Sequence, residues 1–440
     1  MRVYKPSGIE WLGEIPQSWE NVSIRSCFTE SNQRCNTDSY PLLSVTIANG
    51  IIYQDDIENK KDISNDDKSN YKIVPLNAVA YNKMRMWQGA VGVNTLTIGI
   101  VSPAYIVAIP NEKILPNFVS YLFKSKIMIS EFDKNSYGLC LDMNNLRYDD
   151  FRNIKIPLPP LQEQKEIAEF LDSKCEKIQN YIDKKQKLIT LLQEKKQALI
   201  NEAVTKGLNP NIESKNSGIE YLGLIPHHWE VKKLKYVGKV VLGKMLCNEH
   251  QKGYSHCYYL KSKNLQWLNV EVSQIEKMWF SEYEKSLYRI KKDDLLVSEG
   301  GEVGKTCIWN NELAECYIQN SVHKITLNKF NNAKFFLYLF FTYGKLGVFD
   351  SVVSRVSIAH LVLEKLVNVD MVVPPLQEQK QIANFLDKKC EKINSAIEKT
   401  KRQIKLIKEY KNTLINEAVC GRVACSRDFS PTAQNDKKKN

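Results

Sequence analysis

The 440-residue sequence lacks any apolar run of the roughly 18 to 20 residues that a membrane-spanning helix needs. Its best candidate, Phe335–Phe341, lies between Lys334 and Lys345 and is too short. The first residues, Met1–Pro6, also lack the apolar core of a secretory signal. We therefore expect a soluble, cytoplasmic protein with no membrane partner.

Paired cysteines and metal-binding clusters are also scarce. The 11 cysteines include no Cys-x-x-Cys pair. Scattered cysteines in a large chain without an export signal are typical of reduced, buried thiols. One group, Cys247, His250, His256 and Cys257, brings possible zinc ligands together, but its spacing fits no closed structural zinc site well. We expect no metal site.

The sequence also has few features of an active site. It contains no Gly-x-Gly-x-x-Gly dinucleotide motif and no Asn/Asp-Pro-Pro-aromatic tetrad of the amino-methyltransferases. Ser298–Thr306 resembles a phosphate-binding loop, but Glu299 stands where that loop requires glycine and would repel a phosphate. These absences favour a binding protein over an enzyme, and an autonomous nuclease or methyltransferase is the least favoured function.

What the chain does contain is a tandem repeat, which is the strongest signal in the sequence. Residues 7–20 recur as residues 217–230. Residues 159–204 recur as residues 374–419, with about 29 of 46 positions identical. The two halves of the chain are therefore copies of one ancestral unit.

Weaker matches survive in the segments between these blocks. Gly89–Gly92 corresponds to Gly301–Gly304, and Phe118–Phe123 corresponds to Phe335–Phe340. Because the offset between matched positions rises only from 210 to 217, few insertions separate the halves. This pattern predicts two domains of one fold whose surfaces have diverged, as expected when the variable parts discriminate between ligands.

Each variable domain combines strand and helix patterns. Residues 98–109 and 321–327 are rich in β-branched side chains and predict strands. The aromatic segments 118–123 and 335–340 predict amphipathic helices whose aromatic rings lie in the core. We assign both domains to the α+β class.

The repeated blocks 159–204 and 374–419 predict long helices that end near Gly207 and Gly421. Their apolar positions follow a heptad seam, which indicates a coiled coil. The natural arrangement is an antiparallel pair of the two copies, related by a pseudo-twofold axis; dimerisation through each helix separately is the alternative. The seam positions are Leu171, Cys175, Ile178, Ile182, Lys185, Ile189, Leu192, Lys196, Leu199 and Ala203, and then Leu386, Cys390, Ile393, Ile397, Thr400, Ile404, Ile407, Lys411, Leu414 and Ala418.

The net charge of +12 is compatible with a nucleic-acid partner, although residues 1–158 carry 17 basic and 17 acidic groups. Two similar domains on a rigid spacer suit two half-sites on duplex DNA, separated by a stretch that is not read. Base reading needs polar side chains at loop tips that donate or accept hydrogen bonds. For each candidate singly, a solvated surface role is an equal alternative. The candidates are Asn82, Lys83, Arg85, Trp87, Gln88, Asn135, Tyr137, Lys305, Thr306, Gln319, Asn320, Ser321, His323 and Arg355.

Two motifs, each present twice, carry a resemblance to a known family. They are the Pro-Pro-Leu-Gln-Glu-Gln-Lys helix starts and the Ser-Gly-Ile-Glu-x-Leu-Gly-x-Ile-Pro-x-x-Trp boxes. With them the chain closely resembles the specificity subunits of type I restriction–modification systems, over almost its whole length. The resemblance implies target-recognition domains at 1–158 and 207–373, each followed by a conserved helix, at 159–206 and 374–420. The end of the chain fits no element of this pattern, and we expect a disordered tail at 421–440.

The resemblance implies a non-catalytic subunit that binds double-stranded DNA at a bipartite, gapped target, one half per domain. It also implies two modification subunits that methylate adenine N6, and two restriction subunits. S-adenosylmethionine, ATP and Mg would then belong to those partners, and this chain would bind no cofactor. The candidates for docking the modification subunits, or for capping the helix starts, are Gln162, Glu163, Gln164, Gln377, Glu378 and Gln379. The alternative function is a coiled-coil scaffold that assembles proteins without reading DNA.

Overall fold

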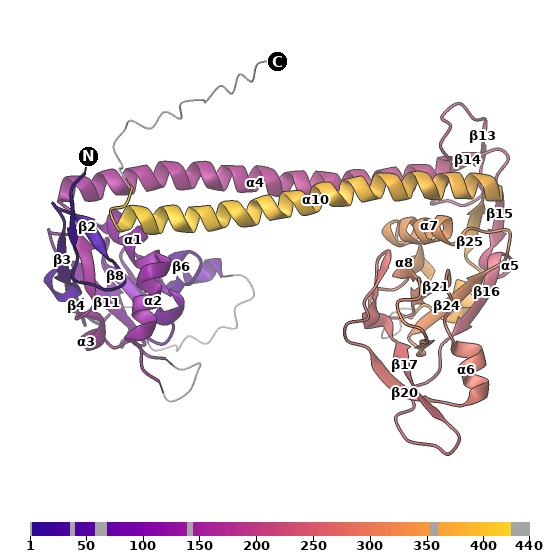
Figure 1. The fold of residues 1–440 in the computed structure, drawn as a ribbon, viewed down its shortest axis with the longest axis horizontal. Helices are drawn as coiled ribbons and strands as arrows, with labels where there is room; N and C mark the ends of the chain where they lie inside the picture. Colours follow the sequence, from indigo (N-terminus) through magenta and orange to yellow (C-terminus); the bar gives the residue numbers. More distant parts are fainter. Residues whose placement is uncertain (1, 36–39, 58–67, 139–143, 353–359, 424–440) are drawn as a thin grey trace. The chain divides into compact units, whose positions relative to one another are not determined.

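The chain folds as two compact units in the computed structural model. Unit 1 comprises residues 1–185 and 402–440, and unit 2 comprises residues 186–401. Each unit therefore holds one variable domain, the start of one long helix and the end of the other (Figure 1). The residues that the structure describes are 2–35, 40–57, 68–138, 144–352 and 360–423.

Unit 1 is built around a four-stranded antiparallel sheet in the order β4-β11-β8-β9. Two shorter pairings flank it, the β5–β6 hairpin and the pair β7–β10. Its strands are β1 (Tyr4–Pro6), β2 (Glu14–Pro16), β3 (Glu20–Ser23), β4 (Phe28–Ser31), β5 (Leu43–Thr46), β6 (Gly50–Tyr53), β7 (Lys72–Val74), β8 (Val79–Asn82), β9 (Val91–Val93), β10 (Gly99–Val101), β11 (Tyr105–Pro110) and β12 (Lys155–Leu158). Its short helices are η1 (Ile24–Ser26), η2 (Gln54–Asp56), η3 (Met86–Gln88), α1 (Pro116–Lys124), α2 (Lys126–Lys134) and α3 (Tyr148–Phe151).

Unit 2 has a four-stranded antiparallel sheet of the same design, in the order β16-β24-β21-β22. Its strands are β13 (Ser214–Asn216), β14 (Leu224–Pro226), β15 (Glu230–Lys233), β16 (Gly238–Leu242), β17 (Ser255–Leu260), β18 (Leu265–Gln266), β19 (Asn269–Val270), β20 (Glu276–Phe280), β21 (Leu295–Ser298), β22 (Thr306–Ile308), β23 (Tyr317–Ile318), β24 (Val322–Leu327) and β25 (Asp370–Val373). Its short helices are α5 (Leu234–Val237), η4 (Ser262–Asn264), α6 (Glu282–Tyr288), α7 (Ala333–Lys345), α8 (Val348–Val352) and α9 (Leu363–Leu366).

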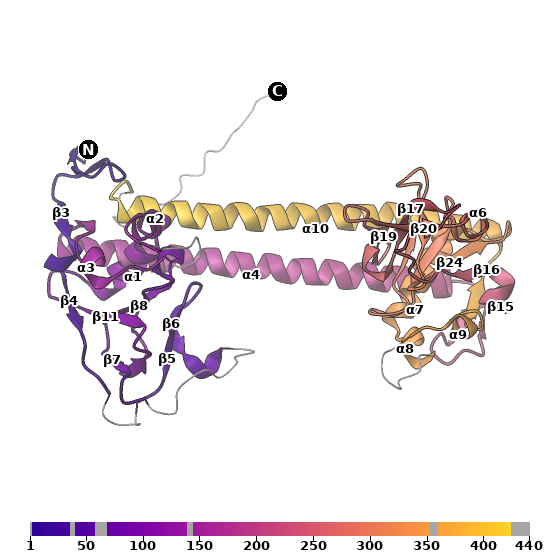
Figure 2. The same ribbon diagram turned by 90° about the horizontal axis from the view of Figure 1, so that it is seen from below.

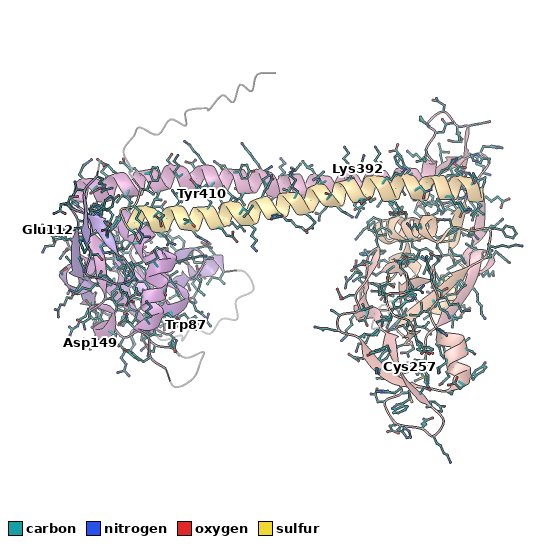
Figure 3. The ribbon with its side chains drawn as sticks, in the orientation of Figure 1. Trp87, Glu112, Asp149, Cys257, Lys392 and Tyr410 are labelled. Carbon is teal, nitrogen blue, oxygen red and sulfur yellow. The ribbon has the colours of Figure 1, made fainter. Side chains whose placement is uncertain are left out.

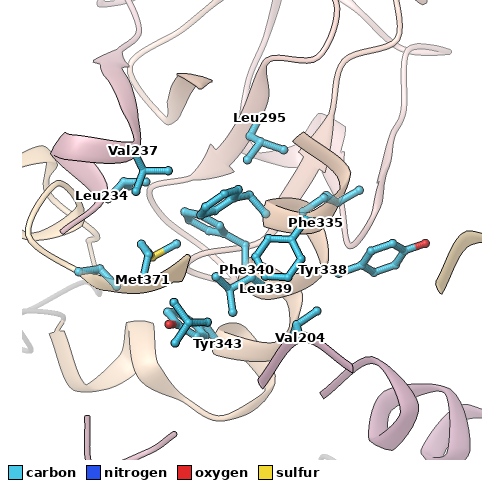
Figure 4. Close-up of a cluster of buried hydrophobic side chains, with 14 of the residues drawn as sticks. Val204, Leu234, Val237, Leu295, Phe335, Tyr338, Leu339, Phe340, Tyr343 and Met371 are labelled. Atoms are coloured by element: carbon cyan, nitrogen blue, oxygen red, sulfur yellow. The ribbon is translucent and has the colours of Figure 1, made fainter. Parts of the chain in front are cut away.

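Aromatic side chains fill the core of each unit, as the sequence predicts. In unit 1, Phe123 of α1 contacts Phe28, Phe132 and Phe151, with ring centroids 5.5 to 5.7 Å apart. In unit 2, α7 is buried along most of its length and packs against strands β21 and β25 and the end of α4 (Figure 4). Burial of this large apolar area is the main force that holds each domain together.

The two long helices are α4 (Leu161–Lys206) and α10 (Leu376–Val419), of 46 and 44 residues. Every predicted seam position is buried or half-buried. Within unit 1, Cys175 near the start of α4 lies close to Lys411 near the end of α10. The positive charge of Lys411 opposes the rise in the pKa of Cys175 that burial causes. Within unit 2, Lys196 Nζ donates to Asn394 Oδ1 at 2.9 Å. In each unit the start of one helix thus packs beside the end of the other (Figure 2). The predicted α+β fold with an antiparallel helix pair is confirmed.

The glycine stop signals are also confirmed. α4 ends at Lys206, directly before Gly207, which has φ of +76°. α10 ends at Val419, two residues before Gly421, which has φ of +74°. A residue without a Cβ is required at Gly421 for a second reason, since an added Cβ would lie 2.5 Å from Pro16 Cδ.

The segment 98–109 differs from a single strand. It forms β10 and β11, separated by a turn in which Tyr105 N donates to Ser102 O at 3.0 Å. Pro103 accounts for the break, because proline has no N–H to continue a strand ladder. Among the described residues, every helix is too short or too polar to cross a bilayer. The expected tail lies outside the described residues from residue 424 onward.

Candidate nucleic-acid interface and helix junctions

The strongest predicted cluster in unit 1 lies on the turn between β8 and β9. Gly89 ends η3 with φ of +90°, and any Cβ there would lie 2.8 Å from Ile129 Cδ1 of α2. Inside the turn, Trp87 Nε1 donates to Met84 O at 3.1 Å, and Asn82 Oδ1 accepts from Met84 N at 3.0 Å. The turn is therefore closely tied to the body of the domain.

This turn presents polar side chains to solvent. Arg85 and Gln88 are exposed, and Asn82, Lys83 and Trp87 are half-buried. Trp87 lies on the side of the domain away from the long helices of unit 1 (Figure 3). An exposed guanidinium on an ordered turn has the geometry that bidentate recognition of a base edge or phosphate requires.

The second predicted loop in unit 1 follows α2. Tyr137 is 68% exposed. It forms a bridge with Asn145, with N···O distances of 3.1 and 3.0 Å in the two directions. Asn135 is half-buried, and its Nδ2 donates to Glu131 O at 2.8 Å. Of the two candidates, Tyr137 is therefore exposed enough to contact DNA, whereas Asn135 caps the C-terminal end of α2.

The candidates in unit 2 divide into surface and interior residues. Gln319, Asn320 and Ser321 are half-buried and bond to one another, and Ser321 Oγ also accepts from Ser262 N at 3.0 Å. Lys305 Nζ pairs with Glu302 at 2.9 Å. Lys305 lies in the turn between β21 and β22, and Gln319, Asn320 and Ser321 lie in the turn between β23 and β24.

Thr306 and His323 lie inside the domain, and each is 0% exposed. Thr306 Oγ1 donates to Gly304 O at 2.8 Å, and His323 Nε2 lies 2.6 Å from Leu361 O. Burial lowers the pKa of His323, which favours the neutral ring. Neither side chain can reach a base in this conformation, so we no longer include Thr306 and His323 among the candidate DNA contacts. Arg355 lies outside the described residues.

The predicted helix-start residues of α4 form a junction inside unit 1. Gln164 is 0% exposed. Its Nε2 donates to Pro159 O at 2.8 Å and Lys113 O at 2.9 Å, and its Oε1 accepts from Leu115 N at 2.7 Å. The side chain thus joins the helix start to the loop before α1, which is neither a cap nor a docking role. Gln162 is exposed, and its Nε2 donates to Glu166 Oε1 of the same helix at 2.9 Å.

Glu163 holds the N-terminal box against the same helix start. Its carboxylate accepts from Trp19 Nε1 at 2.6 Å and pairs with Arg2. Arg422 Nη2, just after α10, donates to Leu12 O at 3.1 Å, so the box also contacts the segment that follows α10. The box therefore contacts both the start of α4 and the residues directly after α10.

Unit 2 repeats this junction with one difference. Gln379 Nε2 donates to Pro374 O at 2.8 Å, and its Oε1 accepts from Asn332 N at 2.8 Å. Glu378, however, pairs with His228 Nε2 at 2.7 Å, and the buried Trp229 Nε1 has no partner among the described residues. Gln377 is exposed. Most partners of these residues lie far away in sequence, as Trp19 does from Glu163 and His228 from Glu378.

This difference predicts unequal costs for the same substitution. Trp19→Phe and Trp229→Phe remove the same volume, but only the first removes a hydrogen bond to a carboxylate. We expect Trp19→Phe to cost about 2 kcal/mol more in the free energy of unfolding than Trp229→Phe. Chemical denaturation of the two variants measures the difference, and equal costs would show that the indole–Glu163 bond contributes nothing.

The possible zinc ligands are not gathered into one cluster in the described part of the chain. No group of three potential ligands occurs within the described residues. His250 and His256 instead pack on Trp279, with ring centroids 4.6 and 4.7 Å away. The phosphate-loop-like segment forms the tight turn before β22, where Gly301 and Gly304 have positive φ of +74° and +75°.

Comparisons with known proteins agree with these observations. The family model for the type I restriction modification DNA specificity domain matches residues 16–191 and 226–406. A putative type I restriction enzyme MjaX specificity subunit of Methanocaldococcus jannaschii is 25% identical, over 94% of this chain and 95% of its own length. The MjaVIII specificity subunit of the same organism is 26% identical over 74% of each chain.

Solved structures share the fold. One chain, from work on complex assembly and conformational transition of the type I restriction–modification system, superposes with a TM-score of 0.71 at 16% identity. The match covers 93% of this chain and 99% of that one. The crystal structure of the HsdS subunit from Thermoanaerobacter tengcongensis gives a TM-score of 0.54 at 17% identity, over 93% and 98% of the two chains.

The family match covers both variable domains and most of both long helices, and the duplicated fold agrees with it. The chain therefore belongs to the type I restriction–modification specificity subunits, the non-catalytic, cofactor-free subunits that recognise the DNA target within the restriction–modification complex.

Proposed function

We propose that each unit reads one half of a bipartite, gapped duplex DNA target, and that the paired helices set the unread gap. The observation that carries this proposal is a repeated fold with diverged loops: the sheet order is the same in both units, while the turns at its edge differ in sequence. The recognition domains correspond to residues 1–158 and 207–373, and the spacer helices to 159–206 and 374–420.

The base-contacting side chains of unit 1 are proposed to be Arg85 and Gln88, supported by Asn82, Lys83 and Trp87 and by Tyr137. In unit 2 the proposed contacts are Lys305, Gln319, Asn320 and Ser321. These residues share an exposed or half-buried position on turns beside the four-stranded sheets. Arginine and amide side chains provide the paired donors and acceptors that distinguish bases in the major groove.

The long helices are proposed to dock two modification subunits. Apolar side chains off the seam remain exposed: Tyr181, Leu406 and Tyr410 belong to unit 1, and Leu188 and Leu191 belong to unit 2. Solvent-facing aromatic and aliphatic groups on a helix are typical of protein interfaces. Gln162 and Gln377 are exposed at the two helix starts and are proposed as further contacts. Two restriction subunits would join the complex, and S-adenosylmethionine, ATP and Mg would bind to the partners, in the cytoplasm.

The test is selection from a duplex library by the chain assembled with its methylating partner. Methylated molecules should be enriched in two short conserved blocks separated by a gap of constant length and random sequence. Enrichment of one uninterrupted block, or of none, contradicts the proposal.

Arg85 should contribute to only one of the two blocks. Arg85→Ala is expected to lower methylation of the best target about tenfold and to relax the preference at one base pair, because a bidentate contact discriminates by about 1–3 kcal/mol. Arg152→Ala is the matched control, since Arg152 is exposed in the same unit and, within the described residues, forms its ion pair with Asp149, at 3.1 Å. A uniform loss across all sequences would instead indicate a phosphate contact.

A further inference from the structure

A lysine in unit 1 joins three segments that are distant in sequence. Lys124, the last residue of α1, directs its ammonium group at three backbone carbonyls. Nζ donates to Thr46 O at 3.1 Å and Ile47 O at 2.7 Å in the β5–β6 hairpin, and to Gly89 O at 3.0 Å. Gly89 belongs to the same turn between β8 and β9 as Arg85 and Gln88. One side chain therefore connects the helix, the hairpin tip and the candidate reading turn.

The chemistry of this contact suits a fixed connection. Each of the three protons of an ammonium group finds a carbonyl acceptor, which satisfies the group. Burial lowers the pKa of Lys124 to about 8, so the side chain remains mostly protonated at neutral pH. The glycines of the hairpin and of β9 allow close contact: a Cβ on Gly92 would lie 2.7 Å from Ile51 N. The hairpin thus lies directly on the strand that leaves the reading turn.

Unit 2 builds the same three-way junction from different residues. The match of Phe118–Phe123 with Phe335–Phe340 places Phe341 at the position of Lys124. Phe341 packs edge-on against Trp267, with ring centroids 5.6 Å apart. Trp267 lies in the turn of the β18–β19 hairpin, and its Nε1 donates to Glu302, in the turn between β21 and β22.

The two hairpins occupy equivalent places in their units. Leu268 N, in the turn of the second hairpin, donates to Thr306 O of β22 at 2.9 Å, so this hairpin also lies on the strand that leaves the glycine turn. Trp267 is fixed from several sides: a Cβ on Gly344 would overlap its ring, and Lys345 Nζ lies 5.0 Å from its centroid. The arrangement of helix, hairpin and glycine turn is thus kept, whereas the residue types that join them have changed.

We propose that Lys124 and Trp267 are positioning residues that fix the hairpin and the reading turn of their own unit, so that each sets the sequence preference of one half-site only. This inference rests on the function proposed above. A side chain retained for stability alone could be replaced by any group that packs equally well. A junction that aims the base-contacting side chains must instead keep its geometry, since hydrogen bonds to base edges depend on position.

The experiment uses the full chain assembled with its methylating partner and two duplex libraries, each with one half-site randomised. The variants are Lys124→Met and Trp267→Leu. Their controls are Lys126→Met, which changes an exposed side chain two residues from Lys124, and Tyr283→Leu, which changes an exposed aromatic side chain elsewhere in unit 2. The measured quantity is the ratio of methylation on the best half-site to that on its single-base variants. If Lys124→Met or Trp267→Leu folds poorly, Lys124→Gln or Trp267→Phe is used in its place, because these substitutions keep more of the original contacts.

We expect Lys124→Met to lower this ratio roughly tenfold at the half-site that Arg85→Ala affects, and to leave the other half-site unchanged. Trp267→Leu should lower the ratio at the other half-site and leave the half-site of unit 1 unchanged. Both control variants should give the same ratios as the parent chain. Equal loss of methylation on all sequences, with the ratio unchanged, would overturn the inference in favour of a purely structural role. Effects of either variant on both half-sites would also overturn it. If the parent chain enriches no gapped motif, the proposed function itself fails.

Discussion

Inserting four residues into both long helices is expected to lengthen the unread gap of the DNA target without changing either half-site. Four helical residues add about 6 Å, which is nearly two base pairs of duplex DNA. The opposed insertion points are after Lys185 in α4 and after Lys401 in α10, where both helices pass from one unit to the other. Each unit keeps all of its own contacts, so its base preference should be retained.

The two insertions must be made together. An insertion in α4 alone would leave four residues without a partner and shift every later seam position, which interrupts the coiled coil. We expect that single insertion to abolish methylation. Insertion of seven residues in both helices preserves the heptad register and should add about three base pairs. Mapping of methylated adenines in the library measures the gap; a fixed gap with altered half-sites would show that the helices do not set the spacing.

Gln164→Leu is expected to destabilise unit 1 by about 3 kcal/mol. The substitution keeps the size of the side chain but leaves Pro159 O, Lys113 O and Leu115 N without their side-chain partner. Each buried group that loses its partner costs about 1–3 kcal/mol, and some will recover a bond by relaxation. Urea denaturation followed by fluorescence measures the change.

Two further variants show whether this role is local. Gln162→Leu changes an exposed neighbour with one bond inside the helix, and should alter the unfolding free energy by less than about 0.5 kcal/mol. Gln379→Leu should reproduce most of the loss in unit 2, since Gln379 bonds to Pro374 O and Asn332 N as Gln164 bonds to Pro159 O and Leu115 N. Unchanged stability of Gln164→Leu together with weaker binding of the modification subunit would instead favour a docking role.

Much of the architecture could be predicted because it depends on local pattern. The heptad seam from Leu171 to Ala203 predicts a helix that must bury one stripe, and its copy supplies the partner within the same chain. Gly207 and Gly421 predict helix ends because only glycine readily adopts the left-handed conformation found there. The aromatic segments around Phe123 and Phe340 predict core helices, and both are buried.

The candidate site was predicted less completely, because burial of a polar residue depends on tertiary contacts. Thr306 and His323 have the residue types of a DNA-contacting loop, yet they lie in strands β22 and β24 of the sheet and are buried. Lys124 has the appearance of a surface lysine at a helix end, and the sequence carries no sign of its three carbonyl partners. Trp267 belongs to no repeated motif. A possible signal was the replacement of Lys124 by Phe341 at matched positions, which becomes informative only beside the structure.

By itself the sequence determined the repeat, the two long helices with their ends, the α+β class and the family, since these follow from periodicity, glycine positions and matching motifs within one chain. The tertiary structure decided which polar side chains face solvent, which helix end meets which box, and how Gln164, Glu163 and Lys124 are used. These contacts join residues up to several hundred positions apart, and their energies depend on distance and burial, which a linear pattern does not contain.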